Sequence, residues 1–360
     1  MKLFGCIQAQ LSENLLFQLP ILQNIYTNCM IAMLLKKVPF QLFVLLFLGT
    51  LPVCAQTSNS TIFRFLETTP SAKAAALGGN HVALFGENSE LFYLNPAYLT
   101  NESSRNVSAT FINYLSDSRM GFANGSYNIP SIGTIGVGIR YAGYGSMTEY
   151  DTQGNNLGDL NAGDLSISTA LGTRLSEKLT AGAGVQYIHS SYHVYSSTAI
   201  TGSAGLYYLD TDKKFSAGIS VRNLGDQLTY YNGIRENIPF DVSVGISKKP
   251  EKFPFHMNLT LRQLNDWDLR VFGETERPEF FDNLMRHVLV GGEASLGENF
   301  KLRLGYNYYA HEQAKTSDNF DFAGASIGVG MNIKGILVDI SRSSLSDVGG
   351  VVQMSISTQI

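Results

Sequence analysis

The residues of this chain that could perform chemistry lack the spacing that catalysis or metal binding requires. His311-Glu312 resembles the start of a zinc-binding helix, but no second histidine follows four positions after the first. No serine is followed three positions later by lysine, and the phosphate-binding and dinucleotide-binding glycine motifs are missing. The segment Asp151–Asn156 has the oxygen side chains of a calcium loop, but it does not have the glycine and the terminal glutamate at the required spacing. We therefore expect no catalytic residue, no cofactor and no metal ion.

The segments that must position any functional side chain have the alternating pattern of β-strands. Between residues 133 and 141 every second residue is apolar, while threonine, glycine or arginine stands in between. Neighbouring side chains on a strand point to opposite faces, so such a strand has one apolar face and one polar or tightly packed face. The pattern continues to Ile360, and we expect no helix within it.

Fourteen segments follow this pattern, and most are 8 to 11 residues long. They are 107–114, 119–128, 133–142, 164–172, 179–189, 198–208, 215–223, 240–248, 255–262, 287–296, 301–308, 322–332, 335–342 and 350–360. Ten residues of a tilted strand rise roughly 25 Å, the height of the apolar band of an outer-membrane barrel. The second face is mostly glycine, serine and threonine, whereas a soluble sandwich would turn larger charged residues to water. The pattern therefore predicts an all-β, fourteen-stranded antiparallel transmembrane barrel.

The connections between these segments alternate in length. The connections that follow even-numbered segments are short. Most of the connections that follow odd-numbered segments are long, namely 143–163, 224–239, 263–286 and 309–321. Bacterial outer-membrane barrels have short periplasmic turns and longer outer loops. We therefore expect the outer membrane of a Gram-negative bacterium, with lipid around the barrel and the long loops extracellular. The last segment ends the chain, as closure against the first strand requires.

Several charged residues fall on the face that we assign to the lumen. They have mixed signs and comprise Arg140, Arg222, Arg262, Arg303, Asp241, Glu293 and Asp339. We expect most of them to pair with one another or with plug residues such as Glu67 and Lys73. The alternative is an ion or substrate path.

Composition and the N-terminal residues define the compartment and the domains. Charged residues are 16% of the chain, and the net charge of -4 gives no reason to expect nucleic acid. Lys36 and Lys37, the apolar run 38–51 and Val53-Cys54-Ala55 form a signal peptide with cleavage before Gln56. We expect residues 1–55 to be removed, with 1–32 a mis-assigned start, 56–106 to form a plug and 107–360 the barrel. All three cysteines precede the cleavage site, so no disulfide is expected.

Two motifs within residues 56–106 resemble a known family. The first runs from Ser71 through Lys73 to Gly78 and Gly79, and the second begins with Asn95 and Pro96. Together with Phe65-Leu66-Glu67, Asp266-Trp267-Asp268-Leu269 and Arg303-Leu304-Gly305-Tyr306-Asn307, they are similar to the PorQ family of the type IX secretion system, within the FadL-like fourteen-stranded barrels. This resemblance covers most of residues 60–360 and implies that the N-terminal segment forms a plug inside the barrel.

The resemblance also implies a role and partners. It implies a non-enzymatic outer-membrane component of a cargo attachment complex with a PorU-like sortase, a PorV-like barrel and a PorZ-like surface protein, the last of which it would anchor. The rival hypothesis is a FadL-like transporter of hydrophobic small molecules. Such a transporter needs an apolar path past a movable plug or a lateral opening.

The long loop 263–286 is the candidate for partner docking. It contains the chain's only tryptophan, Trp267, together with Arg277, Phe280 and Phe281. The aromatic residues could anchor a partner. The alternative is that Trp267 lies at the membrane interface, where aromatic girdles are common.

Overall fold

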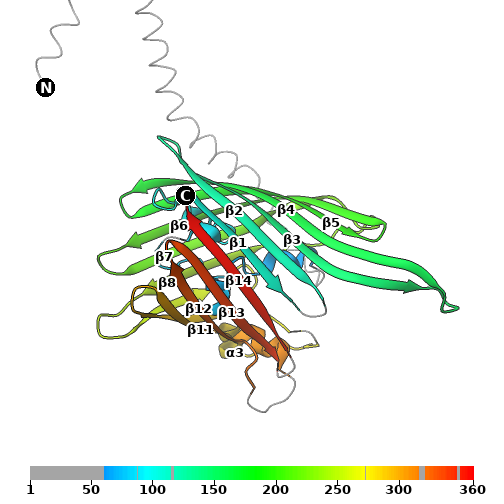
Figure 1. Ribbon diagram of the computed structural model, residues 1–360. Helices are drawn as coiled ribbons and strands as arrows, with labels where there is room; N and C mark the ends of the chain where they lie inside the picture. Colours follow the sequence, from blue (N-terminus) through cyan, green and yellow to red (C-terminus); the bar gives the residue numbers. More distant parts are fainter. Residues whose placement is uncertain (1–60, 87, 115–116, 272, 316–320, 347–348) are drawn as a thin grey trace, which may run out of the picture. The chain divides into compact units, whose positions relative to one another are not determined.

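Fourteen antiparallel strands close into a barrel in the computed structural model, which describes residues 61–86, 88–114, 117–271, 273–315, 321–346 and 349–360 (Figure 1). The strands are β1 (Asn106–Asn113), β2 (Arg119–Ile129), β3 (Gly133–Tyr150), β4 (Asn156–Ser176), β5 (Leu179–Tyr192), β6 (Tyr195–Asp210), β7 (Phe215–Thr229), β8 (Asp241–Lys248), β9 (Phe255–Leu261), β10 (Val288–Leu296), β11 (Phe300–Asn307), β12 (Ala325–Ile333), β13 (Ile336–Ser346) and β14 (Gly349–Gln359). The predicted number, order and fold class are confirmed. The proposed signal peptide lies outside the described residues.

The barrel closes where β1 pairs with β14. Val107 lies opposite Thr358, and the register continues to Asn113 opposite Val352. Each strand also pairs with its neighbour in the chain, which satisfies backbone groups that a nonpolar solvent could not.

The exposed fractions of alternate residues show which face of the sheet is apolar and therefore what surrounds the barrel. On β4, Leu165 and Ile167 are 37% and 47% exposed, whereas Ser166 and Ser168 are 0% and 4% exposed. The same contrast between outward apolar and inward small polar residues holds on β7, β8 and β9. An apolar exterior that encircles the whole sheet is stable in lipid and not in water. The predicted assignment of the two faces is confirmed.

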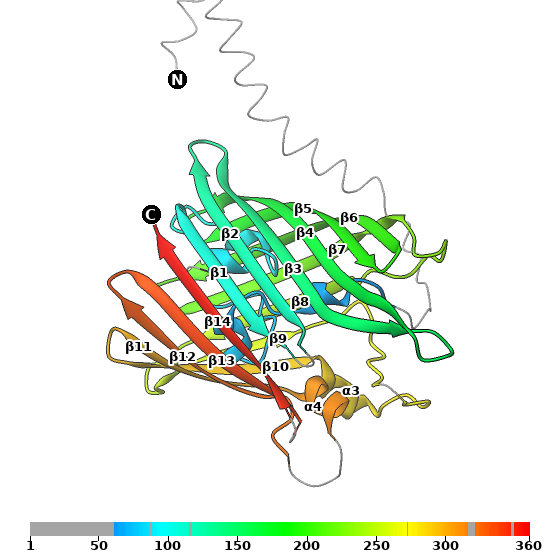
Figure 2. The ribbon, with the colours of Figure 1, turned by 45° about the vertical axis from the view of Figure 1, so that its right-hand side comes forward.

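The two ends of the barrel differ. The terminal end holds the start of β1, the end of β14 and the short turns; the opposite, loop end holds the longer connections (Figure 2). Residues 143–163 were predicted to be a loop, and this is wrong, because β3 and β4 continue to pair as far as Tyr150 and Asn156. A shift of register between Gly143 and Ser146 interrupts the alternation there and hides the extension from a period-two search.

The expectation that no helix interrupts the strands is also wrong. Two short helices occupy loop-end connections, α3 (Phe280–His287) and α4 (Tyr308–Ala314). Asn307 caps α4 by accepting a hydrogen bond from the Ala310 N–H at 3.0 Å. None of the helices in the described parts of the chain has the length and apolar character to cross a bilayer.

Residues 61–86 and 88–105 lie inside the barrel, and we call them the plug (blue to cyan in Figure 2). The plug contains η1 (Arg64–Glu67), α2 (Ala72–Ala76), η2 (Ser89–Leu91) and η3 (Pro96–Tyr98). Its first described residues are at the loop end, where Thr61 pairs with Asn237 and Ile62 N donates to Asn237 O at 2.9 Å. It finishes at the terminal end, where Arg105 O accepts from Ile360 N at 2.8 Å. The plug therefore runs the height of the lumen.

Candidate functional site: a chamber between the plug and the loop end

Glycines of the barrel wall bring the plug backbone into direct contact with the strands. A Cβ atom on Gly305 would lie 2.0 Å from Leu77 C, and one on Gly182 would lie 2.3 Å from Pro96 C. Five wall glycines place an ideal Cβ within 2.5 Å of a backbone atom of the plug, and we call them the glycine seam: Gly172, Gly182, Gly218, Gly291 and Gly305. No larger residue fits at these positions unless the plug moves.

The first plug motif forms a capped turn of helix against the wall. The Ser71 hydroxyl accepts a hydrogen bond from Lys73 N at 3.2 Å and so caps α2. Gly78 ends the turn with φ +101°, and a Cβ there would lie 3.0 Å from Tyr306 N. Gly79 also has positive φ, and the Lys73 ammonium donates to Asn88 Oδ1 within the plug.

The second plug motif ties the plug to the strands through one amide. Asn95 is fully buried, and its Nδ2 donates to Val82 O at 3.0 Å and to Leu206 O, on β6, at 3.1 Å. Its Oδ1 accepts from Ala97 N at 3.0 Å and caps η3, in which Pro96 is the first residue. One side chain thus satisfies backbone groups of both the plug and the wall.

Five of the seven luminal charges lie in two ion-pair groups. Arg222 on β7 donates to Asp241 on β8, with 3.1 Å between Nε and Oδ2. Arg303 lies 2.7 Å from Glu293 and 2.5 Å from Asp339. The sequence pattern could not show these pairings, because the partners come from different strands.

Arg140 has aromatic neighbours instead of a carboxylate. Its guanidinium lies over the rings of Tyr93 and Phe122, 5.1 and 5.0 Å from their centroids, and 5.8 Å from that of Phe65. The electron-rich ring faces attract the buried cation. Arg140 thus joins the plug to β2 and β3.

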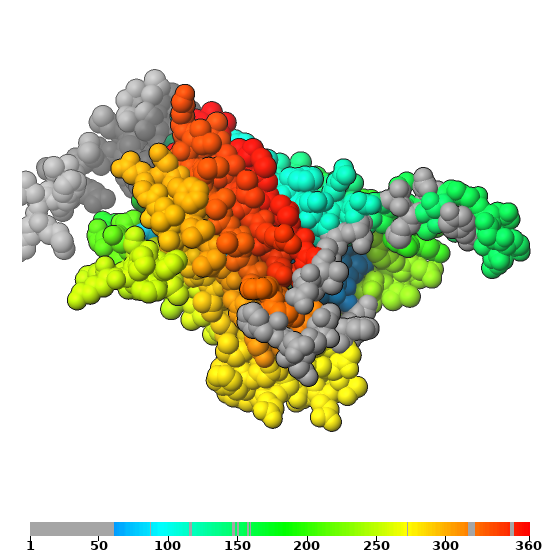
Figure 3. Space-filling view, turned by 60° about the horizontal axis from the view of Figure 1, so that its bottom comes forward, coloured from blue at the N-terminus to red at the C-terminus, as the bar shows by residue number. Residues whose placement is uncertain are grey.

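A chamber of about 490 Å³ opens between the plug and the loop end. Figure 3 shows plug residues (blue) inside the hollow at this end. Its apolar lining includes Phe65, Met120, Leu345 and Val351. Serine, threonine and amide side chains interrupt this lining, and so does Arg262. The chamber has the volume and the mixed lining of a small-molecule site.

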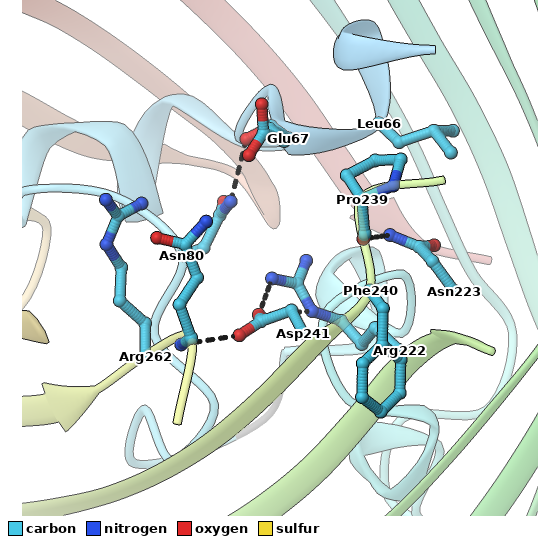
Figure 4. Close-up of a pocket in the computed structure, with 10 residues that line it drawn as sticks. Leu66, Glu67, Asn80, Arg222, Asn223, Pro239, Phe240, Asp241 and Arg262 are labelled. Carbon is cyan, nitrogen blue, oxygen red and sulfur yellow. Dashed lines mark hydrogen bonds and ion pairs between the residues drawn. The ribbon is translucent and has the colours of Figure 1, made fainter. Parts of the chain in front are cut away.

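Arg262 also lines a second, smaller cavity of about 20 Å³ that adjoins the Arg222–Asp241 pair (Figure 4). Its guanidinium lies 4.8 Å from the centroid of the Tyr309 ring. In Figure 4 no interaction joins its side chain to the other labelled residues.

The predicted docking loop presents its aromatic residues to the outside. Phe280 and Phe281 are 70% and 71% exposed, and Trp267 is 45% exposed. The Trp267 ring stacks on His287 at a centroid distance of 4.6 Å and lies 6.1 Å from Phe280. We call Trp267, Phe280 and Phe281 the aromatic patch. Arg277 lies 3.2 Å from Asp268 on the same loop.

A buried arginine that is not among the predicted site residues holds this loop together. Arg286 lies 2.6 Å from Glu274, 2.8 Å from Asp282 and 3.7 Å from Glu312 of α4. The hydrogen bonds with Glu274 raise the pKa of Arg286, and the same bonds lower the pKa of the Glu274 carboxyl. The loop sequence alone gives no sign of this network, because Glu312 comes from another connection.

The comparisons with known proteins define the class by fold. Neither the protein-family profiles nor the curated proteins give a match. The solved structure of the "TodX deltaS2S3 mutant monoaromatic hydrocarbon channel" is similar over 81% of this chain and 99% of its own, with a TM-score of 0.50 and 12% identity. Two others score lower: the "CymD monoaromatic hydrocarbon channel" (TM-score 0.48, 14% identity, 83% and 99% coverage) and a Pseudomonas aeruginosa FadL homologue (0.45, 13%, 81% and 98%).

The chain therefore shares its fold with the TodX channel and forms a closed barrel of fourteen strands. The similar structures are named as channels or a FadL homologue, and none of these three is named as an enzyme. Within the described ranges, no three His, Cys, Asp or Glu side chains gather as metal ligands.

Proposed function

We propose that this protein is a FadL-like outer-membrane barrel that binds a small hydrophobic or amphipathic molecule in its chamber, with the loop end extracellular. The chamber itself carries the proposal. Its volume of about 490 Å³ falls within the usual range of ligand pockets, roughly 300 to 1,000 Å³. The similar fold of a monoaromatic hydrocarbon channel supports a ligand of this class. Passage beyond the chamber requires the plug to rearrange, because the glycine seam fixes it to the wall.

Binding of toluene to the purified full chain tests this proposal. Ser343 lines the chamber, and Ser343→Trp places an indole ring there. Toluene binding should weaken at least tenfold, since about 1.4 kcal/mol of lost burial has that effect. Arg342 is the matched control, because it is the exposed neighbour on the same strand, and Arg342→Trp should leave binding unchanged. Binding that is equal in both variants, or no greater than partition into detergent alone, would contradict the proposal.

A second candidate function rests on the aromatic patch. We propose that the loop end docks a surface protein of a type IX attachment complex, as the resemblance to the PorQ family implies. Phe280 and Phe281 are strongly exposed, and the buried Arg286 of the same helix, α3, holds that helix in place through ion pairs with Glu274 and Glu312. Exposed aromatic anchors on a rigid framework are typical of protein interfaces.

Pull-down from native outer membranes tests the docking function. The unmodified chain should recover a PorZ-like surface protein together with the sortase and the sister barrel. The double substitution Phe280→Ser and Phe281→Ser should lose them, whereas Phe322→Ser, at another exposed loop-end aromatic, should not. Equal recovery by both variants refutes docking at the patch. Since this test does not involve the chamber, the two functions can fail independently.

A further inference from the structure

We propose that two adjacent turns at the terminal end of the barrel bind the headgroup phosphate of an anionic phospholipid. The turns join β6 to β7 and β8 to β9. We call their lysines, including the last residue of β8, the lysine patch: Lys213, Lys214, Lys248, Lys249 and Lys252. This site is at the opposite end of the barrel from the loop end, and its ligand is independent of the ligand proposed for the chamber.

The two turns are in contact, which brings the five lysines together. Lys249 N donates to Lys214 O at 3.1 Å, and the Lys248 ammonium donates to Lys213 O at 2.5 Å. Four of the five residues are exposed, and Lys249 is half-buried. The patch therefore presents several ammonium groups on one framework of paired strands and hydrogen-bonded turns.

The lysine patch has an excess of positive charge. The same two turns have two carboxylates, Asp212 and Glu251, against five ammonium groups. In the part of the chain that the structure describes, no lysine of the patch takes part in an ion pair. Like charges at such close quarters repel one another, and a bound anion removes that repulsion.

The other lysines at this end are paired or isolated. Lys178 lies 2.8 Å from Asp210, and Lys301 lies 3.3 Å from Glu293. Lys334 is the one lysine of the β12–β13 turn. A general preference for positive charge at a membrane surface would distribute unpaired lysines around the whole rim. Their concentration on two neighbouring turns indicates a specific site instead.

The position of Lys248 determines which kind of anion reaches the patch. On β8 this lysine continues the outward phase of Val244 and Ile246. Its register partners are Phe215 on β7 and Met257 on β9, and residues directly opposite each other in antiparallel strands point to the same face. Lys248 thus ends a lipid-facing row, where a lysine stem lies on apolar surface and its ammonium reaches the headgroups. An acidic protein below the rim has no access to this face, whereas a phospholipid does.

Aromatic side chains place the patch at the membrane interface. Phe253, in the β8–β9 turn, is 46% exposed, and its ring lies 5.5 Å from that of Phe255. The rings of Tyr208 and Phe215 lie 6.2 Å apart on the neighbouring strands. Aromatic girdles of outer-membrane barrels lie at this level of the bilayer. The ammonium groups favour a headgroup with net negative charge, such as phosphatidylglycerol, over phosphatidylethanolamine, whose own ammonium they repel.

Native mass spectrometry of the purified full chain measures lipid binding. Dimyristoyl phosphatidylglycerol and dimyristoyl phosphatidylethanolamine have the same acyl chains, and glycerol phosphate provides the phosphate without the chains. Phosphatidylglycerol should bind about fivefold more tightly than phosphatidylethanolamine, or better, a ratio that corresponds to about 1 kcal/mol. Glycerol phosphate should bind about tenfold more weakly than phosphatidylglycerol, or worse, because it makes no apolar contacts.

Substitution of three patch lysines locates the site. The preference for phosphatidylglycerol should be lost in the triple variant Lys213→Gln, Lys248→Gln and Lys252→Gln. The matched control removes three exposed cations at the same end but outside the patch, and it should retain the preference: Arg105→Gln, Arg174→Gln and Lys334→Gln. Arginine at the three patch positions keeps the charge and should also retain it, which separates loss of charge from loss of folding.

Each other result overturns a stated part of the proposal. Equal binding of the two lipids to the unmodified chain, or a preference that survives the glutamine substitutions in the patch, overturns the site. An equal loss of preference in the control variant overturns its location. Glycerol phosphate that binds as tightly as phosphatidylglycerol, or polyglutamate that binds to the patch in place of lipid, overturns the assignment to a phospholipid. Toluene binding in the chamber is unaffected by any of these outcomes.

Discussion

Because the glycine seam contacts the plug backbone, we predict that a single methyl group added at a seam position destabilises the protein. Gly182→Ala places a Cβ 2.3 Å from Pro96 C and 2.4 Å from Ala97 N. Both are backbone atoms of the plug, so no side-chain rotation relieves the overlap. The plug must move by about 1 Å to restore ordinary contact distances, which begin near 3.5 Å between carbon atoms.

The expected cost of this substitution follows from that overlap. Overpacking of a close-packed interior costs typically about 1–3 kcal/mol, and a rigid backbone neighbour puts Gly182→Ala at the upper end. A loss of about 3 kcal/mol lowers the melting temperature by about 6–12 °C in a protein of a few hundred residues. Gly121→Ala on β2 is the matched control, because its Cβ would meet only Thr110 O at 3.7 Å. That substitution should be neutral or stabilising by about 0.4–1 kcal/mol, because alanine restricts the unfolded chain.

Thermal unfolding of the purified variants, followed by circular dichroism, measures the difference. Limited proteolysis of residues 61–105 should also become faster in Gly182→Ala if the plug has moved. Equal unfolding temperatures and equal cleavage rates for Gly182→Ala and Gly121→Ala would show that the wall and the plug are not in the close contact described.

Two further predictions concern the plug and the docking loop. Asn95→Ala removes a helix cap and the donor to the Val82 and Leu206 carbonyls, so the free energy of unfolding should fall by about 2–4 kcal/mol in denaturant titrations. Asn101→Ala, at an exposed plug position, should have little effect. Arg286 lowers the pKa of Glu274 below its ordinary value of 4.5, so the stability from this pair is present above about pH 4.5 and is lost as the pH falls through the lowered pKa. The protection of amides in loop 263–286 against hydrogen exchange, corrected for the intrinsic exchange rate at each pH, should therefore fall on acidification below pH 4.5 in the unmodified protein. In Arg286→Gln this protection should already be low at pH 7 and depend little on acid, and an acid response equal to that of the unmodified protein would contradict this prediction.

The strands could be predicted from the sequence because their signal is local. Alternation along β4 and β7 follows from the side chains of each strand alone, and lipid outside the barrel makes the apolar phase unambiguous. The extension of β3 beyond residue 143 was not predictable in this way. The alternation there is interrupted by a register shift, and the pairing with β4 becomes apparent only in the sheet.

The candidate site could be predicted only in part. The plug motifs pointed to residues 71–79 and 95–96, but a chamber has no local signal, since its walls come from the plug and from several strands. Arg262 appeared among the luminal charges, and the expectation was that most of these charges would be paired. Arg262 has no carboxylate partner because Asp241 pairs with Arg222 instead. This pairing depends on distances between residues of different strands, which the sequence does not show.

Crystallography with a brominated ligand tests directly whether the chamber is a ligand site. A crystal of the full chain soaked with 4-bromotoluene should give an anomalous bromine peak inside the chamber, near Met120 and Val351. The same soak of Ser343→Trp should lose that peak, while any bromine sites on the lipid-facing surface remain. Bromine found only on the outer face of the unmodified barrel would contradict the account.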